Sequence, residues 1–196
     1  MVRRLSCFIV LIAGIAGMTW AGDVATMVNL GFSRDSETFA FAQYGIREDS
    51  LFPYAEIFIV DVAQNRFVKD GVIRNDYERR VEPGYDGSAA LYRLLGEQTA
   101  AFEKSDIDHT NTGRLVYVLM DGDEPRAELN FRDFQTENEY TVKLVQSRQG
   151  EGADVRARFH LDVQVLAESG KQSSFQVGLP QFDRAGMQRY RIHQVL

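Results

Sequence analysis

The segment from Val155 to Val165 constrains the fold of this chain most, because its residues alternate strictly between apolar and polar. Every odd position is apolar and every even position is polar. This is the pattern of a β-strand with one face on a core and the other in water. Shorter segments of the same kind lie at 127–132 and 140–144. The pattern predicts antiparallel sheets.

Other segments add strands and one helix to this prediction. Apolar, β-branched and aromatic runs predict strands at about 24–30, 38–44, 55–62, 67–68, 115–120, 174–177 and 190–196, with a hairpin turn at 168–171. One helix is predicted over about 88–104, although Gly96 weakens it. Its apolar stripe is Leu91, Leu94, Leu95, Gln98 and Phe102. We therefore predict a mainly β fold, an antiparallel sheet or sandwich-like domain with one internal α-helix.

The N-terminus has the pattern of a cleavable signal peptide. Arg3 and Arg4 precede an uncharged stretch from Leu5 to Gly17, and small residues stand at −3 and −1 of a cut after Ala21. The apolar stretch is shorter than the ~20 residues that a spanning helix needs, which argues against a membrane anchor. Cys7 lies at the start of the apolar region, which argues against a lipoprotein. Residues 1–21 are thus predicted to direct export to the periplasm or outside the cell. Residues 22–196 are predicted to form one domain without a transmembrane helix.

Removal of residues 1–21 changes the chemistry of the chain. The remaining part has 20 basic residues, two fewer than the whole, against 28 acidic ones, for a net charge of −8. This balance excludes a general nucleic-acid binder, which needs a clustered basic surface. The only cysteine is also removed, so the domain has no disulfide and no thiol nucleophile.

The histidines and acidic loops offer candidate metal ligands. His109, His160 and His193 show no local zinc spacing, and His160 falls on the polar face of its predicted strand. Two loops, Asp106–His109 and Asp121–Pro125, carry closely spaced carboxylates of the kind that bind Ca²⁺. Each supplies few of the six to eight oxygen ligands that Ca²⁺ needs, so a solvated loop and a hairpin turn are expected instead.

The sequence contains no motif that predicts catalysis. A G-x-S-x-G nucleophile elbow and a phosphate-binding glycine loop are both absent from it. We therefore predict no catalytic, cofactor-binding or metal-binding residue. Phe52, Tyr54, Tyr77 and Tyr85 lie in loops or near strand ends, where aromatic side chains are frequent contact residues in recognition. Covering the core is the more frequent role for any one such ring.

Several segments together carry a family resemblance. Residues 28–36, 41–45, 54–62 and 113–118, behind a signal peptide, resemble a family of secreted bacterial proteins, domain of unknown function 2259. The resemblance covers most of residues 22–196 and implies export, without an activity or site residues. Residues 24–68 also resemble a single blade of a TolB-like or WD40-like β-propeller. A propeller needs at least four blades, so a local meander is expected here.

These observations favour a non-enzymatic interaction module. We expect it to bind an envelope protein or a cell-surface component through its loops or an exposed sheet edge. The alternative is a hydrolase that acts on an envelope polymer through carboxylate catalysis. A hydrolase predicts two converging carboxylates, one with a raised pKa, whereas a binding module predicts an apolar patch or an open edge strand.

Overall fold

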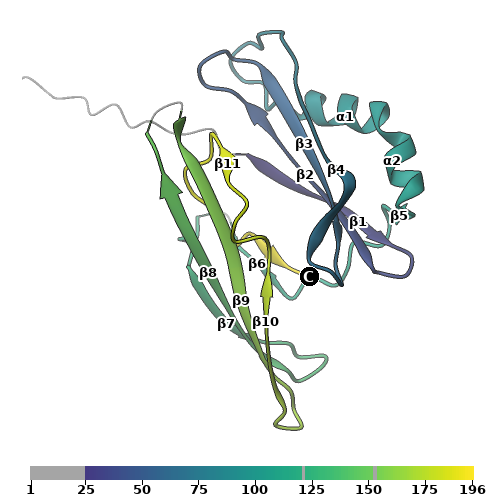
Figure 1. Cartoon of the computed structure of the whole chain (residues 1–196), viewed down its shortest axis with the longest axis vertical. Coiled ribbons are helices and arrows are strands. Elements are labelled where there is room, and N and C mark those ends of the chain that lie inside the picture. Colours follow the sequence, from purple (N-terminus) through teal and green to yellow (C-terminus); the bar gives the residue numbers. More distant parts are fainter. Residues whose placement is uncertain (1–24, 121, 152–153) are drawn as a thin grey trace, which may run out of the picture.

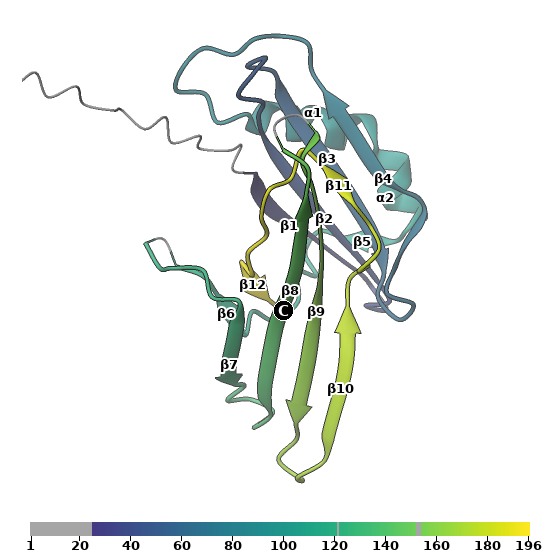
Figure 2. The same ribbon diagram turned by 60° about the vertical axis from the view of Figure 1, so that its left-hand side comes forward.

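The computed structural model describes residues 25–120, 122–151 and 154–196. Its strands form two larger antiparallel sheets that lie at an angle to each other, and two helices cover the outer face of the first sheet (Figures 1 and 2). The prediction of a mainly β, antiparallel fold is confirmed. The predicted signal peptide lies outside the described residues. Among the helices of the described residues, none is long and apolar enough to cross a membrane.

The first sheet contains five strands in the order β4-β3-β2-β1-β5. Its strands are β1 (Thr26–Ser33), β2 (Thr38–Ile46), β3 (Pro53–Asp61), β4 (Arg66–Asp76) and β5 (Ile107–Asp108). Strand β4 is much longer than the 67–68 segment that the sequence predicted. Asp70 has a left-handed φ of 61° and the register shifts between Phe58 and Val60, so a bulge interrupts the alternation within β4.

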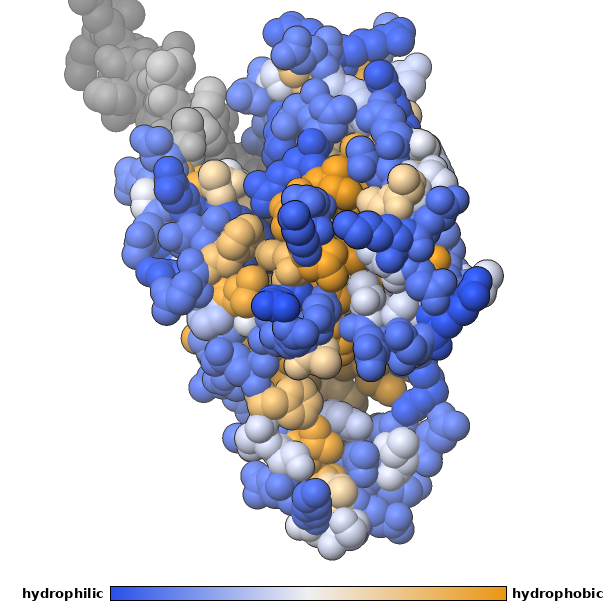
Figure 3. Space-filling view, turned by 45° about the vertical axis from the view of Figure 1, so that its right-hand side comes forward, coloured by the Kyte–Doolittle hydropathy of each residue, from blue (hydrophilic) through white to orange (hydrophobic). Residues whose placement is uncertain are grey.

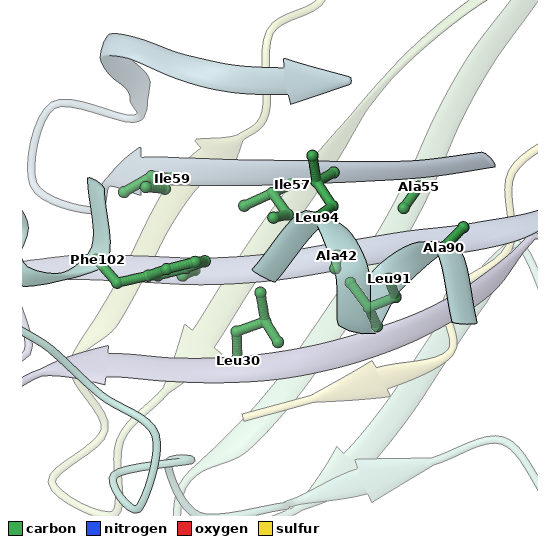
Figure 4. Packing of buried hydrophobic residues seen from close by; sticks show 10 residues of the cluster. Leu30, Ala42, Ala55, Ile57, Ile59, Ala90, Leu91, Leu94 and Phe102 are labelled. Carbon is green, nitrogen blue, oxygen red and sulfur yellow. The ribbon is translucent and has the colours of Figure 1, made fainter. Parts of the chain in front are cut away.

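The two faces of the first sheet carry different residues. Alanine and isoleucine side chains face the helices α1 (Ser88–Glu97) and α2 (Thr99–Lys104), as Figure 4 shows. On this face lie Ala40, Ala42, Ala55, Ile57 and Ile59, with Leu91, Leu94 and Phe102 from the helices against them. Because strand residues alternate, Phe39, Phe41 and Phe58 lie on the opposite face, toward the second sheet. The small alanines let the helices approach the sheet closely.

The single predicted helix at 88–104 is two helices. Gln98 ends α1 with a φ of −116°, and its N–H donates to the Leu95 carbonyl oxygen. Gly96, two residues earlier, lowers the helix propensity of the last turn of α1. The predicted apolar stripe is otherwise correct, since Leu91, Leu94 and Phe102 are buried.

The second sheet contains four main strands in the order β10-β9-β8-β7. They are β7 (Glu128–Arg132), β8 (Glu139–Gln149), β9 (Arg156–Leu166) and β10 (Gln172–Val177), and β11 (Arg184–Ala185) pairs with the start of β9. Ala157 and Val163 of β9 are buried, as the alternation predicted. A separate pair joins β6 (Tyr117–Val118) to β12 (Gln194–Val195).

The strands predicted at 115–120 and 190–196 are much shorter than expected. Each retains only the two paired residues of β6 and β12. Leu115 and Met120 are 50% and 63% exposed. The apolar run therefore does not form a buried strand here.

Arg184 lies where the two sheets meet. Its guanidinium carbon is 4.9 Å from the ring centre of Phe182, 5.0 Å from Phe159, 5.5 Å from Tyr190 and 6.0 Å from Phe58. Phe58 belongs to the first sheet and Phe159 to the second, while the other two rings come from the C-terminal segment. The guanidinium of Arg184 thus makes cation–π contacts with rings from the first sheet, the second sheet and the C-terminal segment.

Asn65 makes a second link between the sheets. It lies in the turn between β3 and β4 with a left-handed φ of 48°. Its Nδ2 donates to the carbonyl oxygens of Gln176 (3.2 Å) and Gly178 (3.0 Å), and its Oδ1 accepts from the Gly178 N–H (2.8 Å). The amide thereby pairs with the end of β10 much as a neighbouring strand would.

A buried carboxylate fixes the turn between β7 and β8. Asp133 accepts hydrogen bonds from the Arg114 guanidinium, the Thr136 hydroxyl and the Gln135 N–H. These bonds, that from Arg114 first, hold the pKa of Asp133 far below its usual value. The bonds tie the segment before β6 to the second sheet.

We expect Arg184→Ala to lower the free energy of unfolding by about 2 kcal/mol, the upper range for desolvated cation–π contacts. For a domain of this size the melting temperature should fall by about 4–8 °C. Arg184→Lys should be intermediate, since an ammonium keeps the charge but not the planar stacking. Arg189→Ala, at an exposed position without an ion pair in the described residues, is the matched control. Equal melting temperatures for Arg184→Ala and Arg189→Ala would contradict this role.

Asp133→Asn should reduce stability at neutral pH and flatten its dependence on acid. The pKa of Asp133 is lowered in the folded state, so the ionised group stabilises the fold above the unfolded value of about 3.9. That contribution decreases as the pH falls below this value toward the folded pKa. The difference in melting temperature between wild type and variant should therefore narrow as the pH falls from 7 to 2.5. A constant difference across this range would show that the charge of Asp133 is not the cause.

Candidate functional site

A pocket of about 650 Å³ opens beside helix α2, β1 and β5. Its apolar part is formed by Leu30, Leu95, Phe102 and Ile107. Its polar part is formed by Asn29, Arg34, Thr99, Glu103, Asp106 and His109. The volume lies within the range of about 300–1,000 Å³ that is common for ligand sites.

His109 is held in a defined position on the pocket wall. Its Nδ1 lies 2.6 Å from the carbonyl oxygen of Leu30, and its ring makes an edge contact with Phe102 at 5.3 Å between ring centres. A carbonyl oxygen only accepts hydrogen bonds, so Nδ1 carries the proton. Nε2 is therefore the acceptor nitrogen of the neutral ring.

A bulge in β1 brings the His109 segment against this strand. The register of β1 shifts between Asn29 and Gly31, and Gly31 has a φ of 103°. A Cβ at Gly31 would lie 2.4 Å from the Asp108 carbonyl oxygen, so only glycine allows this approach. Asn29 links the bulge to the segment that follows β5, since its side chain accepts a hydrogen bond from the Gly31 N–H and donates one to the Thr112 carbonyl oxygen.

The structure separates the carboxylates of the Asp106–His109 segment. Asp108 accepts hydrogen bonds from the hydroxyl and N–H of Thr110, which lower its pKa. Asp106 faces Arg34 at 3.7 Å. Within the described part of the chain, no three His, Cys, Asp or Glu residues are grouped so that they could hold a metal ion. Asp121, from the second acidic loop, lies outside the described residues.

The other two histidines lie apart from the pocket. His160 lies on β9, where its Nε2 is 3.5 Å from Asp162, and its side chain is 18% exposed. His193 precedes β12, and its carbonyl oxygen accepts from the Leu119 N–H. The fold therefore brings none of these histidines together.

Most of the loop aromatics are part of the core or lie over it. Tyr54 is 1% exposed, and the Arg47 guanidinium covers its ring at 3.6 Å. Tyr77 packs against the core between the first sheet and the helices, and the guanidinium carbon of Arg93 lies 4.6 Å from the centre of its ring. Phe52 is half-buried, and Tyr85 is 66% exposed. For Tyr54 and Tyr77 the more frequent role, covering the core, is therefore confirmed, because these residues begin or follow strands whose inner face is covered.

A second open feature, apart from the pocket, is the edge strand β10. All six of its residues are exposed, and it pairs only with β9 in the described sheet. Phe175 pairs with Val163 and Val177 with Leu161, so both continue the apolar face of the sheet, yet they are 51% and 40% exposed. Figure 3 shows hydrophobic residues in a band along the middle of this face, continuing toward the lower end of the molecule.

The other sheet edges carry the features that prevent edge pairing. Strand β4 has five charged residues and a bulge, β7 begins with Glu128 and ends with Arg132, and β5 has two residues. Strand β10 has no charged residue, no proline and no register shift. The sequence shows this uncharged segment, but the pairing order that makes it an edge comes only from the fold.

The shifted carboxyl pKa values bear on the hydrolase alternative. In the described residues, Asp35, Asp86, Asp108 and Asp133 have pKa values that hydrogen bonds lower. None of these four has the raised pKa that a catalytic acid requires.

Comparisons with known proteins identify one family. A family model described as predicted secreted protein (DUF2259) matches residues 40–196. No curated protein and no solved structure matches the chain.

Proposed function

Because the chain belongs to the DUF2259 family of predicted secreted proteins, we propose that it is an exported, non-enzymatic binding module whose β10 edge pairs with an extended segment of an envelope protein. The observation that carries this proposal is the unprotected β10 edge. A partner that adds a strand to this edge satisfies backbone groups that are otherwise left to water.

The hairpin geometry shows which backbone groups are available. The Ala167 N–H donates to the Lys171 carbonyl oxygen, so these residues face each other as a hydrogen-bonded pair. In an antiparallel ladder such pairs alternate with outward-facing ones. The N–H and C=O groups of Gln172, Ser174 and Gln176 therefore face away from β9. The contact between Asn65 and the Gln176 carbonyl agrees with this assignment.

The free part of the edge is short and is placed beside apolar side chains. Asn65 occupies the end at Gln176 and Gly178, which leaves Gln172 and Ser174 to a partner. Ser173, Phe175 and Val177 point to the apolar face, so an added strand would place alternate residues next to Phe175 and Val177. A partner strand with apolar residues at every second position fits this edge.

The hydrolase alternative has less support from the pocket. Asp106 is ion-paired with Arg34, and Glu103 is the only other carboxylate on the pocket wall. A general acid requires a carboxyl group with a raised pKa near a second carboxylate.

Ser174→Pro tests the proposed edge. The outward N–H of Ser174 does not pair with β9, so proline is tolerated there but cannot receive a partner strand. Ser174→Thr keeps the N–H and is the matched control. Each protein is immobilised as residues 22–196 and exposed to an envelope extract of the producing cell. Wild type and Ser174→Thr should capture the same protein from this extract. Ser174→Pro should capture about tenfold less, because proline removes the N–H and with it one hydrogen bond of up to about 1.5 kcal/mol, at an unchanged melting temperature.

Three outcomes contradict the proposal. Equal capture by all three proteins places the interaction elsewhere, and no specific capture by wild type removes its support. A wild-type dimer in sedimentation that Ser174→Pro converts to a monomer assigns the edge to a second copy of the chain.

A further inference from the structure

We propose that the pocket beside His109 binds a small organic cation, an amine joined to an apolar body. This site lies on the helix-covered side of the first sheet, away from β10, and it does not rest on the proposed function (Figure 1). The proposal follows from the charge balance of the pocket, from the acceptors that its wall leaves unused and from its apolar floor.

Asn29, Thr99 and His109 each already use a side-chain donor within the protein. The Asn29 amide donates to the Thr112 carbonyl oxygen. The exposed guanidinium of Arg34 lies 3.7 Å from the Asp106 carboxylate, so these two charges offset each other. The Thr99 hydroxyl donates to the Gly96 carbonyl oxygen at 3.3 Å, which leaves its oxygen as an acceptor. The Nδ1 proton of His109 is used by the Leu30 carbonyl oxygen.

Once the charges of Arg34 and Asp106 offset each other, the wall still carries an unpaired negative charge and unused acceptors. The Glu103 carboxylate makes no hydrogen bond or ion pair with another described side chain. Nε2 of His109 is a further acceptor when the ring is neutral. Arg34, Glu103 and Asp106 together give the wall a net charge of −1. A ligand that matches these groups donates several hydrogen bonds and carries one positive charge, as an ammonium does.

The apolar floor of the pocket indicates the apolar part of the ligand. Leu30 and Phe102 are each 6% exposed, and Figure 4 shows both in the layer between the sheet and the helices. Leu95 and Ile107 extend this apolar surface. An aromatic or branched aliphatic body bound there removes apolar surface from water. The hydrogen bonds of Asn29 and His109 already hold these two side chains in place, so binding does not have to order them.

Matched probes separate charge from shape. Phenethylamine should bind the purified domain by isothermal titration calorimetry at least tenfold more tightly than 2-phenylethanol, which has the same body without charge. 3-Phenylpropanoate, with a negative charge, should bind more weakly than either. Equal affinities for the three probes, a preference for the carboxylate, or no heat with phenethylamine at 10 mM would overturn the proposal.

Variants then assign the contact to this pocket. Glu103→Gln removes the charge at constant shape and should weaken phenethylamine binding about tenfold, whereas Glu82→Gln, exposed and outside the pocket, should not change it. Thr99→Trp should block the pocket sterically without a change of charge. Thr99 is exposed at the start of α2, so the fold should tolerate the larger ring. Unchanged affinity in both pocket variants would place the amine elsewhere.

Discussion

The position of the two sheets depends on how a single cation is accommodated between them. Arg184 faces rings from the first sheet, the second sheet and the C-terminal segment. A charge between two sheets is costly unless it finds compensating groups, and ring faces supply partial negative charge. Nearby, the buried Glu56 is 3.4 Å from Arg74 in the same layer of the first sheet. The junction thus combines cations with aromatic rings and a carboxylate, and these contacts favour the observed position of the two sheets.

This junction uses only one face of the first sheet and only part of the second. The opposite face of the first sheet is free to receive α1 and α2, and the His109 pocket forms where α2 ends beside the β1 bulge. The second sheet extends past the junction, so Phe175 and Val177 stay exposed on its apolar face. The same constraint therefore gives the molecule two separate surfaces, a small pocket at one side and an open strand edge at the other.

Local patterns in the sequence were sufficient for elements whose partners are neighbours in the chain. The alternation in β9 and the stripe of α1 predicted both elements and their buried faces. Sites formed by distant residues were not predictable. The hydrogen bond of His109 joins residues 79 apart, and the contact of Asn65 with Gly178 spans 113. No local signal marks Arg184 as the centre of the junction, and none shows that the Arg47 guanidinium covers the ring of Tyr54.

The exposed edge of β10 could promote aggregation, and the same edge is the one that we propose pairs with a partner strand. An uncharged, flat edge strand normally promotes aggregation, and the other edges of this molecule carry charges, a bulge or few residues. Asn65 shortens the open edge by covering the end at Gly178, which leaves about one outward pair of residues, Gln172 and Ser174. So short a ladder provides few hydrogen bonds of about 0.5–1.5 kcal/mol each. Selectivity at this edge must then come from side chains that contact Phe175 and Val177, and these contacts discriminate between partner strands in a way that backbone pairing cannot.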